Sequence, residues 1–187
     1  MVFQNNLLMG AAGQSAEAYT IDQSCRFDGS SSYMSRTPAS AGNRKTWTQS
    51  AWIKRCALSS WQYPFMNTDT GGNDGSVLHA SDNVFEWLHA SYNYRETDAW
   101  LRDVGAWYHI VWNLDTTLSA SAAVRSKCWI NGVEQTYRQD QAGPDEDLET
   151  QLNNNVLHGI GYNIYDENSW YGGYLAEYIF IDGTALE

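Results

Sequence analysis

The stretch Thr46-Trp-Thr-Gln-Ser-Ala-Trp-Ile-Lys-Arg55 decides the fold class of this chain. Its side chains alternate in polarity, with polar Thr48, Ser50 and Lys54 set against apolar Trp47, Ala51 and Ile53. Successive side chains of a β-strand point to opposite faces, so a period of two predicts a strand that is buried on one face only. The rest of the fold is predicted outward from this strand.

Other short β-rich runs lie on both sides of it, at 24–27, 33–36, 84–89, 90–94, 107–114, 127–130, 156–160 and 174–181. Clusters of Gly, Asn, Asp and Ser separate these runs, and Asp74-Gly75 and Asn131-Gly132 are typical of tight hairpins. In the aromatic run 107–114, the side chains predicted to share one face are Tyr108, Ile110, Trp112 and Leu114. The Ala- and Ser-rich segment 119–124 is too short for a stable helix. Many short strands and no long helix predict an all-β sandwich or barrel.

The length and the charge of the chain argue against several classes of protein. A chain of 187 residues forms one domain with a substantial core, and 14% aromatic against 18% charged residues argues against disorder. The net charge of −11 would repel a phosphate backbone and an anionic membrane surface, so we expect no nucleic-acid partner. No apolar run reaches the 18 or so residues of a membrane-spanning helix, so we expect no membrane insertion.

Residues 1–20 differ from the domain predicted at 21–187, since they show no sustained periodicity. Two interpretations stay open: a frayed terminus, or an arm that orders on a partner through buried side chains. The docking side chains would be Phe3, Leu7, Leu8 and Met9. No Lys or Arg precedes Arg26, so the basic region of a signal peptide is missing. We expect a protein that stays where it is made or leaves inside an assembled particle.

The cysteines are Cys25, Cys56 and Cys128, and their spacing matches no zinc pattern. An odd and sparse set favours free, buried thiols in a protein made in a reducing compartment. One bridge plus one free thiol is the alternative.

Several motifs along the chain resemble those of a known superfamily when they are taken in order. They are Phe27-Asp-Gly29 with Tyr33-Met34, the 47–54 strand, Trp107-Tyr-His109, 129–133, Gly159-Ile-Gly161, 173–177 and Ile181-Asp-Gly183. Over about residues 22–186 the chain resembles the concanavalin A-like, laminin G-like jelly rolls. The resemblance implies a jelly-roll sandwich of two antiparallel sheets. The chain departs from the family pattern at Ala176-Glu177, where relatives carry Asp-Glu.

A narrower resemblance lies in segments 3–11, 35–47 and 178–186, which look like jelly-roll proteins of marine bacteriophages. It implies a virion protein made in the cytoplasm of a bacterial host and placed in a tail fibre, head fibre or other appendage. Its partners would be other virion proteins, and phage fibres imply a homo-oligomer.

The fold that the resemblance implies also hosts glycosidases, so catalysis has to be judged from residues. Glycoside hydrolysis needs two carboxylates roughly 5 to 9 Å apart, and in β-glucanases of this fold they alternate along one strand. Glu146-Asp-Leu-Glu149 lies in an acidic loop with the wrong spacing, and Glu177 has no acidic residue two positions away. His79, His89, His109 and His158 have no nucleophile at a recognisable spacing. The sequence therefore predicts a protein that is not an enzyme.

Aromatic side chains in loops are the candidate sugar-binding groups, while strand aromatics such as Trp52, Trp107, Trp112 and Trp129 are assigned mostly to the core. The loop candidates are Trp61, Tyr63, Tyr92, Tyr94, Trp100, Tyr165, Trp170 and Tyr171. Trp170-Tyr171 is the best candidate for an exposed platform, because it borders Gly172-Gly173 and the polar run 166–168. A protein interface is the alternative interpretation of such a patch.

Calcium is the most credible ion, because it takes six to eight oxygen ligands. The candidate ligands are Asp69 and Asp74, with Asn67 and Asn73, or Asp145 and Asp147, with Glu149. Neither set follows the EF-hand pattern, and ordinary turn chemistry or a solvated acidic loop explains both.

Three functions follow, in order of preference. The first is a non-enzymatic phage appendage domain that attaches to a host surface glycan. The second is a structural head-decoration protein docked through its N-terminal arm, and the third is a glycan-cleaving enzyme.

Overall fold

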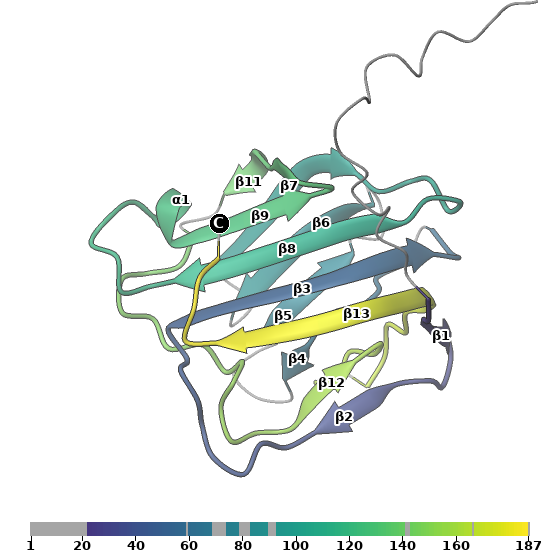
Figure 1. Cartoon of the computed structure of the whole chain (residues 1–187), viewed down its shortest axis with the longest axis horizontal. Helices are drawn as coiled ribbons and strands as arrows, with labels where there is room; N and C mark the ends of the chain where they lie inside the picture. Colours follow the sequence, from purple (N-terminus) through teal and green to yellow (C-terminus); the bar gives the residue numbers. More distant parts are fainter. Residues whose placement is uncertain are drawn as a thin grey trace, which may run out of the picture.

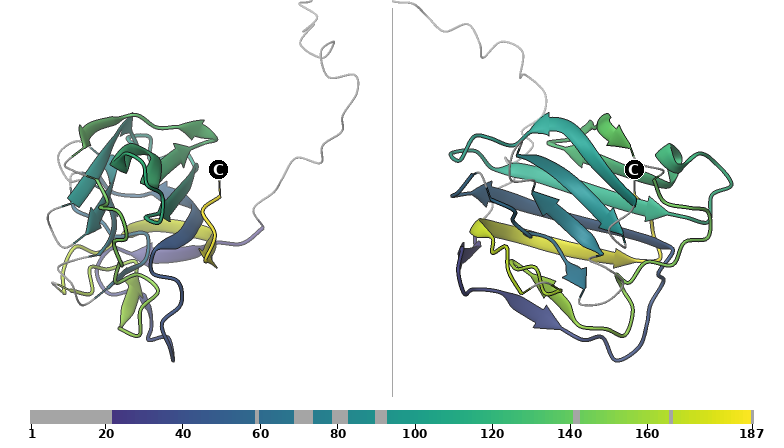
Figure 2. Two further views of the ribbon diagram at one scale, coloured as in Figure 1. Left: turned by 90° about the vertical axis from the view of Figure 1, so that its left-hand side faces the viewer. Right: turned by 180° about the vertical axis from the view of Figure 1, so that it is seen from behind.

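The computed structural model describes residues 22–58, 60–68, 74–78, 83–89, 93–140, 143–165 and 167–186. They form two antiparallel sheets packed face to face, with the six-stranded sheet in front in Figure 1. Its strands run in the order β1 (Cys25–Asp28), β13 (Gly172–Asp182), β3 (Thr46–Arg55), β8 (Tyr108–Asp115), β9 (Ser126–Ile130) and β10 (Val133–Glu134). The predicted all-β sandwich is confirmed, and Figure 2 shows its two layers edge-on and from behind.

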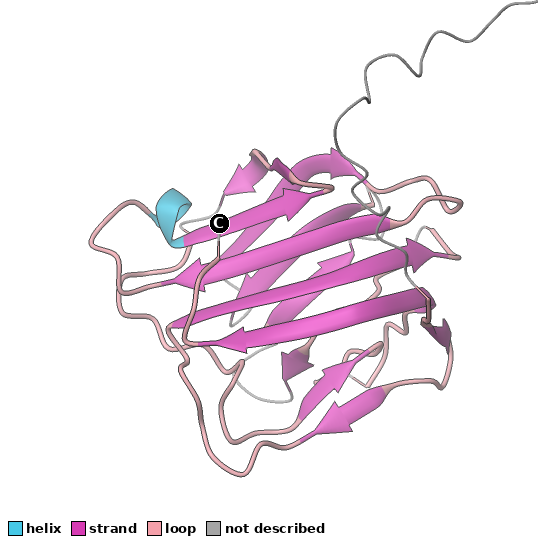
Figure 3. Cartoon of the chain, viewed as in Figure 1, coloured by secondary structure: helices cyan, strands magenta, loops and turns pink. Residues whose placement is uncertain are grey.

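The seven-stranded sheet forms the second layer. Its order is β11 (Tyr137–Asp140), β7 (Asn93–Trp100), β6 (Val84–His89), β5 (Gly75–Leu78), β4 (Asn67–Thr68), β12 (His158–Ile160) and β2 (Met34–Arg36). The one helix of the described residues, α1 (Ala122–Arg125), is a single turn, coloured cyan in Figure 3. No helix in this part of the chain is long and apolar enough to cross a bilayer.

The core lies between the sheets and follows the period of two. On β3, the side chains of Trp47, Ala51 and Ile53 are fully buried, as their alternation predicts. Ile110, Trp112 and Leu114 of β8 are also fully buried, and Ala51 lies opposite Ile110 across the strands. The seven-stranded sheet supplies the facing side chains, among them Phe65, Leu78, Phe85 and Trp87.

The assignment of most strand tryptophans to the core is wrong. Trp112 is buried, but Trp52, Trp107 and Trp129 are only half-buried. Trp52 alternates with the inward Ala51 and Ile53, so period two places it on the outer face. Large apolar residues on that face are explained by their position in the strand, which residue type does not reveal.

The turn predicted at Asn131-Gly132 is confirmed, but the tight turn predicted at Asp74-Gly75 is wrong, because Gly75 begins β5 (Gly75–Leu78) and pairs with Asn67 of β4. Asn131 and Gly132 have φ of 53° and 76°, which two-residue hairpins require, and they join β9 to β10. After β1, the carboxylate of Asp28 accepts hydrogen bonds from the backbone N–H groups of 30–32 and from the Ser31 hydroxyl. These bonds hold the pKa of Asp28 well below its ordinary value.

All three cysteines are free, as expected, but only Cys128 is buried. The expected burial of Cys25 and Cys56 is wrong, because both are exposed. Cys25 begins β1, the strand at the edge of its sheet, and Cys56 follows the end of β3. The arm residues Phe3, Leu7, Leu8 and Met9 lie outside the described residues, so the docking prediction stays a prediction.

Candidate functional site

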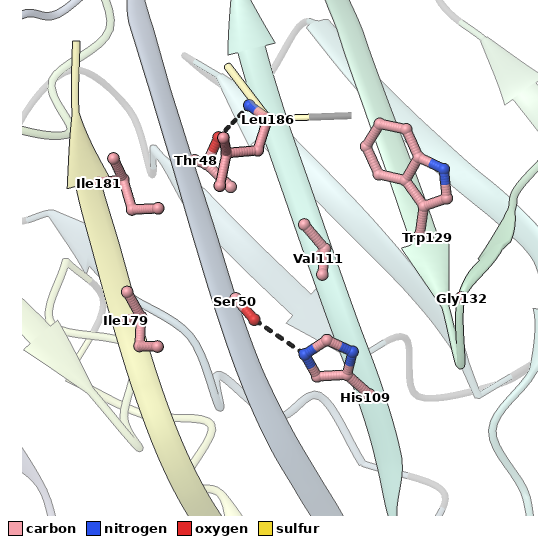
Figure 4. A pocket seen from close by; sticks show the side chains of 9 residues that line it. All are labelled: Thr48, Ser50, His109, Val111, Trp129, Gly132, Ile179, Ile181 and Leu186. Atoms are coloured by element: carbon pink, nitrogen blue, oxygen red, sulfur yellow. Dashed lines mark hydrogen bonds between the residues drawn. The ribbon is translucent and has the colours of Figure 1, made fainter. Parts of the chain in front are cut away.

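An apolar groove of about 480 Å³ lies on the outer face of the six-stranded sheet. Its walls include Val111, Ile179, Ile181, Trp129 and Leu186, the last from the segment that crosses the sheet after β13 (Figures 1 and 4). This groove offers apolar surface but few polar groups for a ligand.

The polar groups of the groove already bond within the protein. Thr48 Oγ accepts the N–H of Leu186 at 2.9 Å and donates to Thr184. Ser50 Oγ lies 3.0 Å from His109 Nε2 (Figure 4). Burial lowers the pKa of His109, which keeps the imidazole neutral, although the charge of Glu177 opposes this effect. The sequence showed no nucleophile near any histidine, since Ser50 and His109 meet only through the pairing of β3 with β8.

A second cavity, of about 350 Å³, has a mainly polar lining. It lies where β2, at the edge of the seven-stranded sheet, meets the loop between β12 and β13. We call it the Tyr33 pocket, and its walls are Tyr33, Ser35, Leu157, Tyr162, Ile164, Tyr165 and Glu167. Its volume is within the range of about 300 to 1,000 Å³ that is typical of small-molecule sites.

Aromatic rings form one side of the Tyr33 pocket. Tyr162 stacks on Trp170 with 4.2 Å between ring centroids, and Tyr33 lies 5.3 Å from Tyr162 and 5.9 Å from Trp170. Tyr33 and Tyr165 are 50% and 48% exposed. Their hydroxyls and the Ser35 hydroxyl form no hydrogen bond with the described residues. The pocket therefore presents ring faces and uncommitted polar groups together.

Asn67 on β4 holds the loop of the pocket in place. Its buried amide donates to the carbonyls of Tyr162 at 2.8 Å and Gly159 at 3.0 Å, and it accepts the N–H of Ile164 at 2.9 Å. The loop closes on itself where Asn163 N–H donates to the Asn168 carbonyl. A loop supported by buried hydrogen bonds is preorganised, which lowers the entropy cost of binding.

Comparison with known proteins identifies the family. Residues 28–185 match the model of the concanavalin A-like lectin/glucanase superfamily, in its laminin G-like branch. The chain belongs to this superfamily. No curated protein matches the sequence.

Solved structures of low sequence identity share the fold. A heptameric SAP-like pentraxin from Limulus polyphemus superposes with a TM-score of 0.58 at 15% identity, over 87% of this chain and 76% of that one. Domain 4 of AbnA, an arabinanase from Geobacillus stearothermophilus solved with arabinotriose, gives 0.57 at 19% identity, over 79% and 65%. Domains LG4-5 of the mouse laminin α1 chain give 0.52 at 9% identity, over 88% and 47%. The chain thus spans less than two thirds of the arabinanase domain and about half of the laminin pair.

The structure places only some of the predicted sugar-binding residues of this superfamily member at the Tyr33 pocket. Trp170 belongs to the aromatic cluster, and Tyr165 lines the pocket. The predicted exposure of Tyr171 is wrong, because it is fully buried and its hydroxyl donates to the carbonyls of Lys54 and Tyr174, both at 3.0 Å. The wall residues Tyr33 and Glu167 were missed as site residues. The sequence signal was present only in part, since Glu167 lies three positions before Trp170, whereas Tyr33 directly precedes β2, more than 120 positions away.

The other predicted aromatics lie elsewhere. Trp61 and Trp100 are exposed. The guanidinium of Arg102 lies over the Trp100 ring, 3.5 Å from the ring centroid. Trp100 ends β7, and four strands separate β7 from β2 in the sheet order, so it does not join the pocket. Tyr63 is buried. Tyr92 and the side chain of Tyr94 lie outside the described residues.

The candidate calcium ligands do not come together in the described residues, which contain no group of three or more His, Cys, Asp or Glu placed for a metal ion. Asp69 lies outside them, while Asp74 is buried and accepts the N–H of Gln151. Asp147 pairs with Lys45 at 2.9 Å, and Asp145 is exposed. The acidic loop is bound to the domain, since Glu149 also pairs with Arg44 and Glu146 with Arg125.

A pair of carboxylates does occur, across strands instead of along one. Glu86 of β6 lies opposite Glu96 of β7, and the two residues are 3% and 4% exposed. Arg138 Nε donates to Glu96 at 2.7 Å. Burial, with the charge of Glu96 as the second cause, raises the pKa of Glu86 to about 8. One carboxyl is therefore protonated at neutral pH, but neither is open to a polysaccharide in this structure.

Proposed function

We propose that this chain is a non-enzymatic carbohydrate-binding domain and that the Tyr33 pocket is its sugar site. The observation that carries the proposal is the combination of the half-exposed Tyr33 and Tyr165 rings with hydroxyls that are free to bond around one cavity. A sugar ring presents C–H groups to an aromatic face and hydroxyls to polar partners at its edge. A pocket with both kinds of surface matches that chemistry better than the apolar groove does.

The fold family supports the proposal only in general terms. Its members include lectins and glucanases, and the AbnA domain was solved with arabinotriose. Those likenesses concern the fold, so the argument for sugar binding depends on the pocket itself.

The arrangement of carboxylates supports a protein without glycosidase activity. Among the described residues that line the pocket, Glu167 is the one carboxylate, whereas glycoside hydrolysis uses two on opposite sides of the bond. The buried pair of Glu86 and Glu96 has almost no surface that a substrate could reach.

We further propose that the domain is part of a bacteriophage appendage and attaches the virion to a host surface glycan. The support is the resemblance of segments 3–11, 35–47 and 178–186 to marine phage proteins. The alternative, a head-decoration protein docked through residues 1–20, is favoured by one observation. Ile179, Val133 and Leu186 are exposed apolar side chains of the six-stranded sheet and its covering segment, a kind of surface that often marks protein contacts.

Glycan binding is tested by array screening followed by calorimetry on the best ligand. We expect Tyr33→Ala and Tyr165→Ala each to weaken binding by about fivefold to tenfold, the loss of one aromatic contact. Trp100→Ala is the matched control, because it removes an exposed aromatic ring far from the pocket. Equal losses in all three variants, or none in the pocket variants, would reject the Tyr33 pocket as the sugar site.

The place in the virion is tested by counting copies per purified particle with quantitative mass spectrometry and antibody labelling. A few copies at a tail or vertex would support attachment. Copies covering the head would support decoration, and absence from particles would reject both virion roles.

A further inference from the structure

Glu167 places a carboxylate in the wall of the Tyr33 pocket. Its side chain is exposed and forms no hydrogen bond or ion pair with the described residues. Its backbone has a φ of 53°, in a loop closed by the pairing of Asn163 with Asn168. The carboxylate therefore lies at the pocket wall without a bonding partner among the described residues.

No basic side chain balances this charge among the residues that line the pocket. Arg36 follows the wall residue Ser35 on β2, but it lines two neighbouring cavities beside Met66 and His158. Burial raises the pKa of Tyr162, which lines the pocket. The charge of the nearby Glu167 raises that pKa further. The whole chain adds a net charge of −11 to this local field.

We propose that the Tyr33 pocket selects amino sugars with a free ammonium group, accepts neutral sugars less well and rejects uronic and sialic acids, with Glu167 as the residue that sets this order. This inference rests on the proposed function. An ammonium at the sugar ring pairs with Glu167 while the ring lies on the exposed tyrosines. A sugar carboxylate in the same place meets an unpaired carboxylate and loses affinity.

The size of the preference follows from the exposure of Glu167. Pairs of exposed charges contribute little, so we expect the amino sugar to bind about twofold to fivefold more tightly than the neutral one at low salt. Screening is strong when the Debye length falls to about 3 Å near 1 M salt, so the preference is expected to disappear there.

Calorimetry with matched trisaccharides (trimers of one sugar) tests the predicted order of affinities. Each set holds a neutral sugar, the same sugar with an amine in place of the 2-hydroxyl, and the same sugar oxidised to its uronic acid. Sets built on glucose, galactose and mannose cover the common ring stereochemistries. The expected order within the set that binds is amine, neutral, acid, and the reverse order or equal affinities would overturn the proposal.

Two variants separate the pocket charge from the charge of the whole molecule. Glu167→Gln is expected to bring the ratio of amine to neutral affinity close to one, whatever its effect on the neutral sugar. Glu134→Gln removes an exposed carboxylate of β10, on the other sheet, and is expected to keep the preference. Equal effects of both variants would show a non-specific field and would overturn the role of Glu167.

The result also distinguishes this inference from the proposed function. If neutral trimers bind and the amine gives no gain, only the charge selection fails. If no trimer of any set binds, the Tyr33 pocket fails as a sugar site and the selection fails with it.

Discussion

At the scale of single residues, the most unusual environment is that of Glu86. Strand pairing places it beside Glu96, and the sandwich leaves it almost no exposed surface. One of its carboxyl oxygens, Oε2, has no hydrogen-bond partner in the described structure. A buried charge without a partner is costly in free energy, so burial raises the pKa of Glu86 to about 8. The folded protein therefore keeps the proton on Glu86 at neutral pH.

Glu86→Gln tests this at the level of stability. The pKa of Glu86 is about 8 in the folded protein and 4.5 in a free side chain, so only the unfolded state loses the proton between these values. The contribution of Glu86 to the free energy of unfolding should therefore be fully present below pH 4.5 and fall as pH rises to 8, by about 5 kcal/mol at most. Urea unfolding of the wild type and Glu86→Gln across this range measures the difference, and we expect the variant to lack this part of the pH dependence. Parallel curves for the two proteins would contradict the assignment.

Tyr171→Phe tests the corrected role of the residue beside Trp170. The ring is in the core and its hydroxyl donates to two backbone carbonyls, so the variant should lose about 1 to 3 kcal/mol of stability. Sugar affinity should not change. A loss of binding with unchanged stability would instead restore Tyr171 as a contact residue.

At the scale of elements, the pocket depends on a short strand that carries no aromatic residue. β4 has two residues, Asn67 and Thr68, and both are buried. Asn67 pairs in the sheet through its backbone and bonds the loop through its side chain. This one amide connects the sheet to the loop that carries Tyr162 and Tyr165.

Asn67→Leu is expected to release that loop. The variant keeps the branched shape of the side chain but leaves buried carbonyls and one buried N–H without partners, at a cost of about 2 to 4 kcal/mol. Hydrogen exchange should accelerate at the Ile164 amide, which donates to Asn67, while amides of β3 and β8 keep their relative protection. Unchanged exchange at Ile164 would show that the loop is held by other contacts.

At the scale of the whole molecule, the reactivity of the three cysteine thiols shows which of them the sandwich shields from solvent. Cys128 lies between the sheets, and burial raises the pKa of its thiol, while Cys25 and Cys56 are exposed. Cys128 should therefore react only when the domain unfolds.

A thiol reagent that absorbs light on reaction measures this directly. We expect two reactive thiols in the native protein and three in denaturant, as Cys25 and Cys56 are the exposed pair. Cys128→Ala is the control, and it should show two reactive thiols both in the native state and in denaturant. Three fast thiols in the native protein would contradict the burial of Cys128.

Strands and their faces were predictable because their signal is local. The alternation in 46–55 correctly placed Trp47, Ala51 and Ile53 in the core, and the Asn131-Gly132 turn was correctly placed between two strands. The same rule, applied to Trp52 and not only to its neighbours, would have placed that ring on the outer face. Residue type was a weaker guide than position in the period.

The sequence by itself determined the all-β class, the sandwich, the superfamily and the predominance of negative charge, since composition, short-range alternation and motif order all lie along the chain. Only the tertiary structure brings the residues of the candidate site together. Tyr33 meets Tyr162 and Trp170 because β2 pairs with β12, and Glu86 meets Glu96 because β6 pairs with β7. Alternation shows that a side chain faces one side of a sheet, but which side is covered, and by what, depends on strands that come together across long stretches of sequence.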